Sequence, residues 1–227
     1  MINNCLSVIM STFNSEAYVE HSVNSILNQS YKNFEFLIID DASIDKTFNK
    51  LTEISKIDSR VKVYQNEENI GLTKSLNKLI QMSKGEYIAR QDDDDTSEHI
   101  RLECQIDFMK EKKVQICTTR AKVLNSSKLI PGISFYIPNK IAINYKNPFI
   151  HGTLMIKKSL LDDIGGYDEN FYYSQDYKLF KDLIRQNQKI KTINKPLYKL
   201  NIENNISSNY KKEQKYFADC VRKNLTP

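Results

Sequence analysis

The sequence predicts an α/β fold, in which a mostly parallel sheet is flanked by helices. Short apolar runs alternate with segments whose apolar residues recur at helical spacing, an order typical of repeated strand–helix units. With 227 residues, of which 40% are hydrophobic and 27% charged, the chain has the balance of one globular domain. We expect neither a membrane-spanning segment nor a leader, because no apolar run reaches the about 18 residues that cross a bilayer.

Four strand–helix units are predicted in the first half of the chain. The predicted strands are apolar runs at residues 6–10, 34–39, 61–64 and 87–89. The helix after each strand has one apolar face, formed in turn by Val19, Val23, Ile26 and Leu27; by Phe48, Leu51 and Ile54; by Leu72, Leu76, Leu79 and Ile80; and by Leu102, Ile106 and Met109. Ser15 and Ser43 are predicted to cap the first two helices.

The second half of the chain is less regular. Residues 128–147 are mixed, and prolines interrupt them. Residues 153–156 predict a strand that returns to the sheet, and residues 159–164 predict a short helix that ends at two glycines. Two more helices are expected, one around residue 180 and a basic one from residue 209 onward. The chain therefore divides at about residues 110 and 200, within one domain that carries a short C-terminal helical extension.

A short cluster that contains polar residues follows each of the first four strands. The clusters are Ser11, Thr12, Phe13 and Asn14 after the first, Asp40 and Asp41 after the second, Asn69 and Gly71 after the third, and an acidic run after the fourth. Open α/β sheets bind ligands at the carboxyl ends of their strands. We therefore expect these four clusters to gather on one edge of the sheet.

The acidic run consists of Asp92, Asp93, Asp94 and Asp95. Adjacent carboxylates repel one another, so a cation among them would favour a compact fold. Mg²⁺ and Mn²⁺ prefer oxygen ligands, and Mg²⁺ commonly takes one or two carboxylates together with substrate phosphates. The alternative interpretation is a solvated acidic turn. The sequence has no glycine-rich phosphate loop, so a bound diphosphate would depend on a metal and on side chains.

Several short motifs occur in a fixed order along residues 6–183. They are residues 7–14, residues 38–47, Asn69 and Gly71 with Asn77, residues 85–89, the acidic run with Arg101 and Gln105, residues 165–168, and residues 175–177. Each motif is weak alone, but their order and spacing resemble family 2 glycosyltransferases, which share the fold called GT-A. We expect Arg101 and Gln105 to brace the helix that follows the acidic run.

The resemblance implies transfer of one sugar from a nucleotide-diphospho-sugar, with UDP as the default nucleotide, to an acceptor hydroxyl with inversion. By position, the donor-binding residues would be Ser11, Thr12, Phe13, Asp41, Asn69, Gly71, Asp92 and Asp93. Asp94 and Asp95 would hold Mn²⁺ or Mg²⁺, and His151 is either a further contact to the metal or the donor phosphates or a structural histidine. Asp176 would be the general base, with Asp168 and Glu169 as competing carboxylates.

In this scheme residues 1–110 form the nucleotide-sugar-binding half of the domain, residues 111–200 the acceptor and catalytic half, and residues 201–227 a basic helical tail. The Q-x-x-R-W signature of processive polymerases is absent, which favours addition of a single sugar. Ser11 and Gln175 depart from the residues that are common in the family at these positions.

The expected acceptor is a saccharide, lipid-linked in the hypothesis that places the enzyme in bacterial surface polysaccharide assembly. Scattered cysteines without a paired motif fit a reducing cytoplasm. The basic tail helix has three alternatives: docking on anionic lipid at the inner face of the cell membrane, closing over the core, or forming a homodimer. We expect no nucleic-acid partner, because no aromatic–basic pattern is present.

Two rival functions remain at this point. The residues from Asp92 to Thr96 also satisfy the D-x-D-x-T pattern of haloacid dehalogenase-type phosphatases, although that nucleophile belongs on an early apolar strand. A non-catalytic nucleotide-sugar-binding module is the second rival, because Gln175 and Lys178 replace residues that are often acidic in the family.

Overall fold

The computed structural model describes residues 6–202 and 210–227. The strands are β1 Leu6–Thr12, β2 Phe34–Asp40, β3 Val61–Gln65, β4 Tyr87–Arg90, β5 Thr96–Ser97, β6 Ile116–Val123, β7 Leu129–Ile130, β8 Met155–Lys157 and β9 Ile190–Leu200. The α-helices are α1 Val19–Leu27, α2 Thr47–Ile57, α3 Leu72–Met82, α4 Arg101–Lys112, α5 Asn139–Ala142, α6 Lys158–Ile164, α7 Gln175–Arg185 and α9 Lys211–Lys223, and the 3-10 helices are η1 Ile133–Tyr136 and η2 His151–Thr153.

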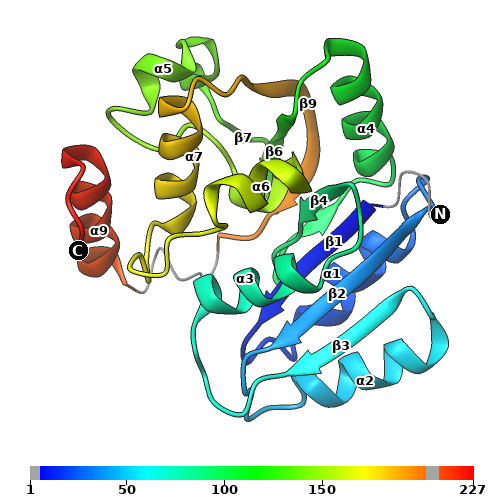
Figure 1. Cartoon of the computed structure of the whole chain (residues 1–227). Helices are drawn as coiled ribbons and strands as arrows, with labels where there is room; N and C mark the ends of the chain where they lie inside the picture. Colours follow the sequence, from blue (N-terminus) through cyan, green and yellow to red (C-terminus); the bar gives the residue numbers. More distant parts are fainter. Residues whose placement is uncertain (1–5, 203–209) are drawn as a thin grey trace.

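The described strands form one nine-stranded sheet in the order β3-β2-β1-β4-β8-β6-β9-β5, with β7 paired to β6 (Figure 1). The strands β3, β2, β1 and β4 are parallel, as expected for strand–helix units. The short strand β8 runs antiparallel between β4 and β6, so it joins the two halves of the sheet. The carboxyl ends of β1, β2 and β4 consequently lie at one edge.

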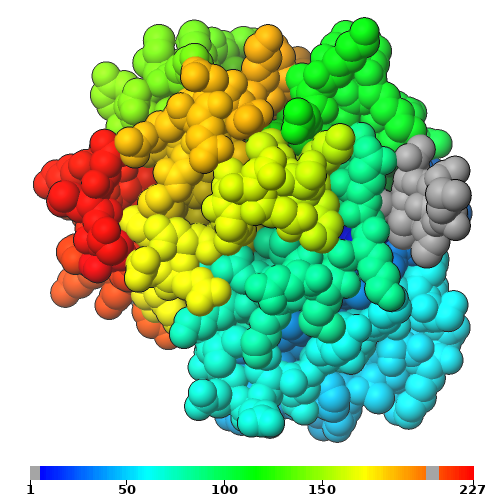
Figure 2. Space-filling view, in the orientation of Figure 1, coloured from blue at the N-terminus to red at the C-terminus, as the bar shows by residue number. Residues whose placement is uncertain are grey.

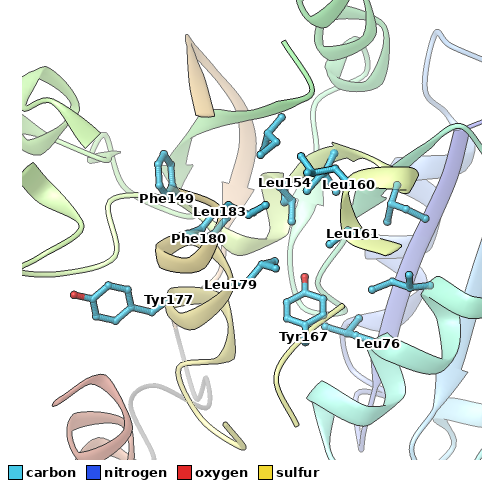
Figure 3. Close-up of a cluster of buried hydrophobic side chains, with 14 of the residues drawn as sticks. Leu76, Phe149, Leu154, Leu160, Leu161, Tyr167, Tyr177, Leu179, Phe180 and Leu183 are labelled. Carbon is cyan, nitrogen blue, oxygen red and sulfur yellow. The ribbon is translucent and has the colours of Figure 1, made fainter. Parts of the chain in front are cut away.

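Helices cover both faces of the sheet and bury two apolar clusters. On one face, residues of α1, α2 and α4 pack on one set of alternating strand residues, including Val8 and Met10. On the other face, residues of α3, α6, α7 and α9 pack on the intervening set, including Ile9. Leu179, Phe180 and Leu183 project from α7 into this second cluster, near Phe149 and Leu154 (Figure 3). The period-two alternation of a buried strand explains why both faces of β1 are apolar.

The four predicted strand–helix units are confirmed, as is the left-handed end of α6 at Gly165, where φ is +79°. Two of the larger strands, β6 and β9, were not predicted. The predicted strand at 153–156 starts later, because Thr153 belongs to η2. Both predicted helix caps are wrong: Tyr18 and Lys46 occupy the cap positions of α1 and α2, and neither helix has a side-chain cap.

The basic helix α9 packs against α7, where its red surface meets the gold one in Figure 2. Its residues Phe217, Ala218, Cys220 and Val221 join the cluster that α7 enters. The Lys181 ammonium of α7 donates to the carbonyl oxygens of Val221 and Arg222 at 2.8 and 2.9 Å, which satisfies the last turn of α9. Of the three alternatives for this helix, closure over the core is the one that occupies its apolar face. In the described ranges, no helix has the length and apolar character needed to cross a bilayer.

Candidate active site

The loops after β1 and β4 meet through direct hydrogen bonds. The Thr12 hydroxyl donates to the Asp93 carboxylate at 2.6 Å. The backbone N–H of Asp41, after β2, donates to the carbonyl oxygen of Thr12 at 2.8 Å. Burial raises the pKa of Asp93, and the charge of Asp92 acts in the same direction. Three of the four polar clusters therefore share the edge where the parallel strands end.

Asp41 organises the fourth cluster. Its side chain is buried and accepts from the backbone N–H groups of Ile70 and Gly71 at 3.0 and 2.8 Å. The Asn66 amide donates to it at 2.7 Å and the Ser75 hydroxyl at 3.2 Å. These four bonds occupy much of the carboxylate, so Asp41 fixes the loop between β3 and α3.

The other predicted donor-binding residues differ in exposure. Ser11 is buried in β1, whereas Phe13 is 47% exposed and Asn69 lies on the surface. Gly71 has φ of +88°, and a Cβ there would lie 2.5 Å from the ring of Tyr172. Both the backbone conformation and the close approach of Tyr172 therefore require glycine at this position.

The acidic run follows a buried arginine that no sequence motif marks. The Arg90 guanidinium, at the end of β4, forms a very short ion pair with Asp92. The side chain of Arg90 is 1% exposed, whereas that of Asp92 is 27% exposed and reaches the surface of the site. The backbone N–H of Asp92 donates to the Tyr198 hydroxyl at 3.1 Å. Thus β4 and β9 together fix the position of Asp92.

Asp94 and Asp95 are the predicted metal ligands, and their environments differ. Burial raises the pKa of Asp94 to about 7, and the charges of Asp93 and Asp92 add to this effect. Burial also raises the pKa of Asp95 well above its ordinary value, with Asp92 and Asp94 as further causes. Asp95 accepts the backbone N–H of Asn201 at 2.6 Å, which ties the run to the end of β9. Asp94 is therefore the carboxylate with more freedom to bind a ligand.

Oxygen-rich donors of this kind suit a hard divalent cation. The residues that the structure describes contain no group of three or more His, Cys, Asp or Glu side chains arranged to hold a metal. One or two carboxylates completed by phosphate oxygens remain compatible with Mg²⁺ or Mn²⁺. A bound cation would offset the burial and the neighbouring charges of Asp93 and Asp92 that raise the pKa of Asp94.

The predicted base Asp176 lies in the first turn of α7, close enough to Asp92 for the two charges to interact. The Asn147 amide donates to Asp176 at 2.7 Å. Burial raises the pKa of Asp176, and Asp92 acts in the same direction. The competing carboxylates have other contacts: Asp168 lies 3.5 Å from the Lys178 ammonium, and Glu169 accepts from Asn77 at 2.9 Å.

His151 belongs to η2 beside this site. Its Nε2 atom lies 2.7 Å from the Tyr167 hydroxyl, which leaves Nδ1 as its other nitrogen for a metal. Burial lowers the pKa of His151 well below its ordinary value, and the Arg90 charge adds to this effect. The imidazole is accordingly neutral at neutral pH.

Arg101 and Gln105 brace α4, the helix after the acidic run, as predicted, because they tie it to the end of β4 and to η2. Arg101 donates to the carbonyl oxygens of Gly152 and Arg90 at 2.7 and 2.9 Å, and Gln105 donates to that of Thr153 at 2.8 Å. Burial lowers the pKa of Arg101 to about 10. Arg90, Tyr198 and Asn147 were not predicted, because Arg90 ends β4, Tyr198 lies in the unpredicted strand β9, and Asn147 lies in an irregular loop without a motif.

A family model named glycosyl transferase family 2 matches residues 7–167. Among curated proteins, the chain is 32% identical over 223 residues to WfgD of Escherichia coli, a UDP-Glc:alpha-D-GlcNAc-diphosphoundecaprenol beta-1,3-glucosyltransferase. That match covers 95% of this chain and 85% of WfgD. The chain spans only 59% and 62% of the length of two other bacterial relatives.

Solved structures show the same architecture. S. aureus TarS in complex with UDP-GlcNAc has a TM-score of 0.77 and 24% identity, over 90% of this chain and 60% of TarS. The mannosyltransferase PcManGT from Pyrobaculum calidifontis, in complex with GDP-Man and Mn²⁺, has a TM-score of 0.77 and 18% identity, over 98% of this chain and 65% of PcManGT. The fold is therefore the GT-A fold that the sequence predicted.

Proposed function

This chain belongs to glycosyltransferase family 2, and we propose that it transfers a single sugar from a nucleotide-diphospho-sugar to an acceptor hydroxyl with inversion at the anomeric carbon. The observation that carries the proposal is the pairing of two features at one edge of the sheet. Thr12 at the end of β1 donates to Asp93 of the acidic run and accepts from the backbone N–H of Asp41 after β2, and the charges of Asp92 and Asp176 interact. These contacts support a donor site and a base for the acceptor that lie on the same side of the sheet edge.

The donor is proposed to be a UDP-sugar that lies along the ends of β1, β2 and β4. Phe13 offers an exposed aromatic face for the base, and Ser11, Thr12, Asp41, Asn69 and Gly71 would complete the nucleotide pocket. Asp92 and Asp93 would lie toward the ribose and diphosphate. UDP is preferred because WfgD is named for UDP-Glc and TarS was solved with UDP-GlcNAc.

Asp94 and Asp95 would hold Mn²⁺ or Mg²⁺, with His151 as a further candidate. Such an ion, when bound, stabilises the negative charge that develops on the departing nucleoside diphosphate. The protein contributes the donor oxygens and their fixed positions. Asn201 holds Asp95 through its backbone N–H, and Arg90 holds Asp92 next to them.

Asp176 is proposed to take the proton of the acceptor hydroxyl during attack. A carboxylate with a raised pKa is a stronger base than an exposed one, and burial supplies that shift here. The Asn147 amide orients the carboxylate through its 2.7 Å bond. A single displacement inverts the anomeric carbon and needs no covalent nucleophile, so one base suffices.

We place the reaction in bacterial surface polysaccharide assembly, with a lipid-linked saccharide as acceptor. The name of WfgD contains such an acceptor, a GlcNAc carried on diphosphoundecaprenol. The phosphatase alternative loses its support, because the family match covers the acidic run itself. The rival of a non-catalytic module is distinguished by turnover, since such a module would bind donor without transfer.

The test is ligand-dependent thermal stability of the full chain with UDP, dTDP, GDP and their sugar conjugates, with and without Mn²⁺. Ligand at about 100 times its Kd stabilises the native state by about 2.7 kcal/mol. We expect a shift with UDP-sugars that requires Mn²⁺, is lost in Asp94→Ala and persists in the control Asp162→Ala, an α6 substitution outside the site. Absence of a shift with every nucleotide would overturn the donor site.

A further inference from the structure

The segment between β7 and η2 exposes a group of large apolar side chains. Ile133, Tyr136 and Tyr145 are 87%, 75% and 73% exposed, and Ile137 and Ile141 are 41% and 54% exposed. Isolated exposed apolar residues are common, but a contiguous group marks an interaction site. This group, called here the apolar ridge, lies on η1, α5 and the adjoining turns at the upper left edge in Figure 2.

The apolar ridge is not an unfolded loop, because the opposite side of the same segment is anchored in the protein. Ile141 lies in α5, and Ile137 and Tyr145 lie in the turns just before and after this helix. Ala142 and Ile143 point the other way and are buried. The carbonyl oxygen of Ile143 accepts from the Tyr177 hydroxyl at 2.6 Å, and Asn139 donates to the carbonyl oxygen of Ile190 at 3.0 Å. A fixed scaffold therefore presents the exposed side chains outward.

Positive charge surrounds the apolar ridge. Residues 112–161 and 183–202 contain fourteen Lys and Arg residues and no Asp or Glu. The rest of the chain holds the other 19 basic residues and all 28 acidic ones. Exposed lysines next to the apolar ridge include Lys140 and Lys146 on its own segment, and Lys189 and Lys191, which flank the Ile190 contact. These two stretches of the chain thus combine exposed Ile and Tyr side chains with lysines and contribute no carboxylate to this surface.

We propose that the apolar ridge docks this protein on an anionic lipid bilayer. Apolar side chains enter the boundary between headgroups and acyl chains, and lysines bind acidic headgroups. A protein partner fits this surface less well. Residues 112–161 and 183–202 contribute no carboxylate, so a protein partner would have to present an acidic surface. The C-terminal helix is a poorer anchor, since its apolar face is already packed on α7.

The position of the apolar ridge connects it to the site. Asn147, two residues after Tyr145, donates to Asp176 at 2.7 Å. Membrane contact at the apolar ridge would therefore hold the base close to the bilayer surface, where the headgroup of a lipid-linked acceptor lies. This link to the acceptor rests on the proposed function, whereas the docking surface itself rests only on exposure and charge.

The test is co-sedimentation of the full chain, without donor, with vesicles of phosphatidylcholine alone or mixed with phosphatidylglycerol. We expect binding to the anionic vesicles, weakened at least about tenfold by the combined substitutions Ile133→Ser, Ile141→Ser and Tyr145→Ser. The matched control is Ile57→Ser, because Ile57 is 87% exposed at the end of α2, as Ile133 is in η1. This control should bind like wild type.

Replacing Lys140, Lys189 and Lys191 by Gln should weaken binding to the anionic vesicles and leave the thermal unfolding temperature unchanged. The inference is overturned if neither vesicle binds the wild type, if Ile57→Ser weakens binding as much as the ridge substitutions, or if only substitution of Lys211, Lys212 and Lys215 does so. A lipid-independent dimer that the ridge substitutions dissolve would also overturn it. UDP-dependent thermal stability measured on the same variants reports the donor site separately.

Discussion

At the scale of single residues, the carboxylates of the site are held by contacts that serve both structure and chemistry. Asp93 accepts from Thr12, Asp95 accepts from Asn201, and Asp92 pairs with the buried Arg90. Burial raises the pKa of Asp94 to about 7, and the charges of Asp93 and Asp92 add to this effect. The metal-free protein therefore carries an electrostatic cost at this position.

That cost predicts that Asp94→Asn stabilises the metal-free protein. At about pH 8 the carboxyl is charged in both the folded and unfolded states, and we expect the free energy of unfolding to rise by about 1–2 kcal/mol, after allowance for solvent screening. The folded pKa lies above the unfolded one, so the gain should fade as the pH drops through about 7 toward about 4. Urea denaturation at about pH 8 and at about pH 4, in the presence of a chelator, measures the difference in free energy of unfolding between Asp94→Asn and wild type. A loss of stability at about pH 8 would contradict the account.

Gly152 is a second residue with a specific consequence. A Cβ at this position would overlap the Tyr198 hydroxyl and the Asp92 carboxylate, so the packing excludes any side chain. We expect Gly152→Ala to lower the free energy of unfolding by about 1–3 kcal/mol and to weaken donor binding by displacing Asp92. Adding Tyr198→Phe should recover part of the stability, because it removes one of the overlapping atoms. A Gly152→Ala protein as stable as wild type would show that the site relaxes freely.

At the scale of elements, the sequence predicted the strand–helix units whose apolar patterns are local. The strands β6 and β9 were missed because their patterns are mixed. β9 contains several lysines and Pro196, and its pairing with β6 shifts register beside Arg120. Such a strand is recognised only through its neighbours, since β6 and β9 stabilise each other over a long sequence separation. The residues Tyr198 and Asn201 that complete the site come from this unpredicted part.

The contact between α7 and α9 gives a prediction at the same scale. Lys181 is 6% exposed, and its two bonds satisfy carbonyl oxygens in the last turn of α9. We expect Lys181→Met to lower the free energy of unfolding by about 1–3 kcal/mol, because those carbonyl oxygens lose a charged donor. Faster amide exchange should be confined to α9. The control Lys212→Met, on the exposed side of α9, should change stability by less than about 0.5 kcal/mol. If Lys181→Met and Lys212→Met changed the free energy of unfolding equally, the bonds of Lys181 to α9 would not be what stabilises this helix.

At the scale of the whole molecule, charge is divided between two regions. The acidic residues belong to the first half of the chain and to residues 162–182 and 203–227, and the stretches without acidic residues include β6, α5 and the whole of β9. The site lies where these regions meet, with Arg90 and Arg101 buried beneath its carboxylates. The order of motifs singled out the carboxylates that we propose for the site, whereas this division of charge over the surface required the fold.

The central claim is sugar transfer with Asp176 as base, and the most direct measurement is the rate of transfer from a UDP-sugar to a diphospholipid-linked GlcNAc acceptor. We expect Asp176→Asn to lower kcat by about 10²–10⁴-fold and to leave UDP-sugar binding intact. In wild type, the rate should fall at acidic pH as Asp176 gains its proton, at a pH above the ordinary carboxyl range because burial raises its pKa. Asp168→Asn is the matched control and should keep most of the rate. Transfer by Asp176→Asn at the wild-type rate, or a product that retains the donor's anomeric configuration, would contradict the account.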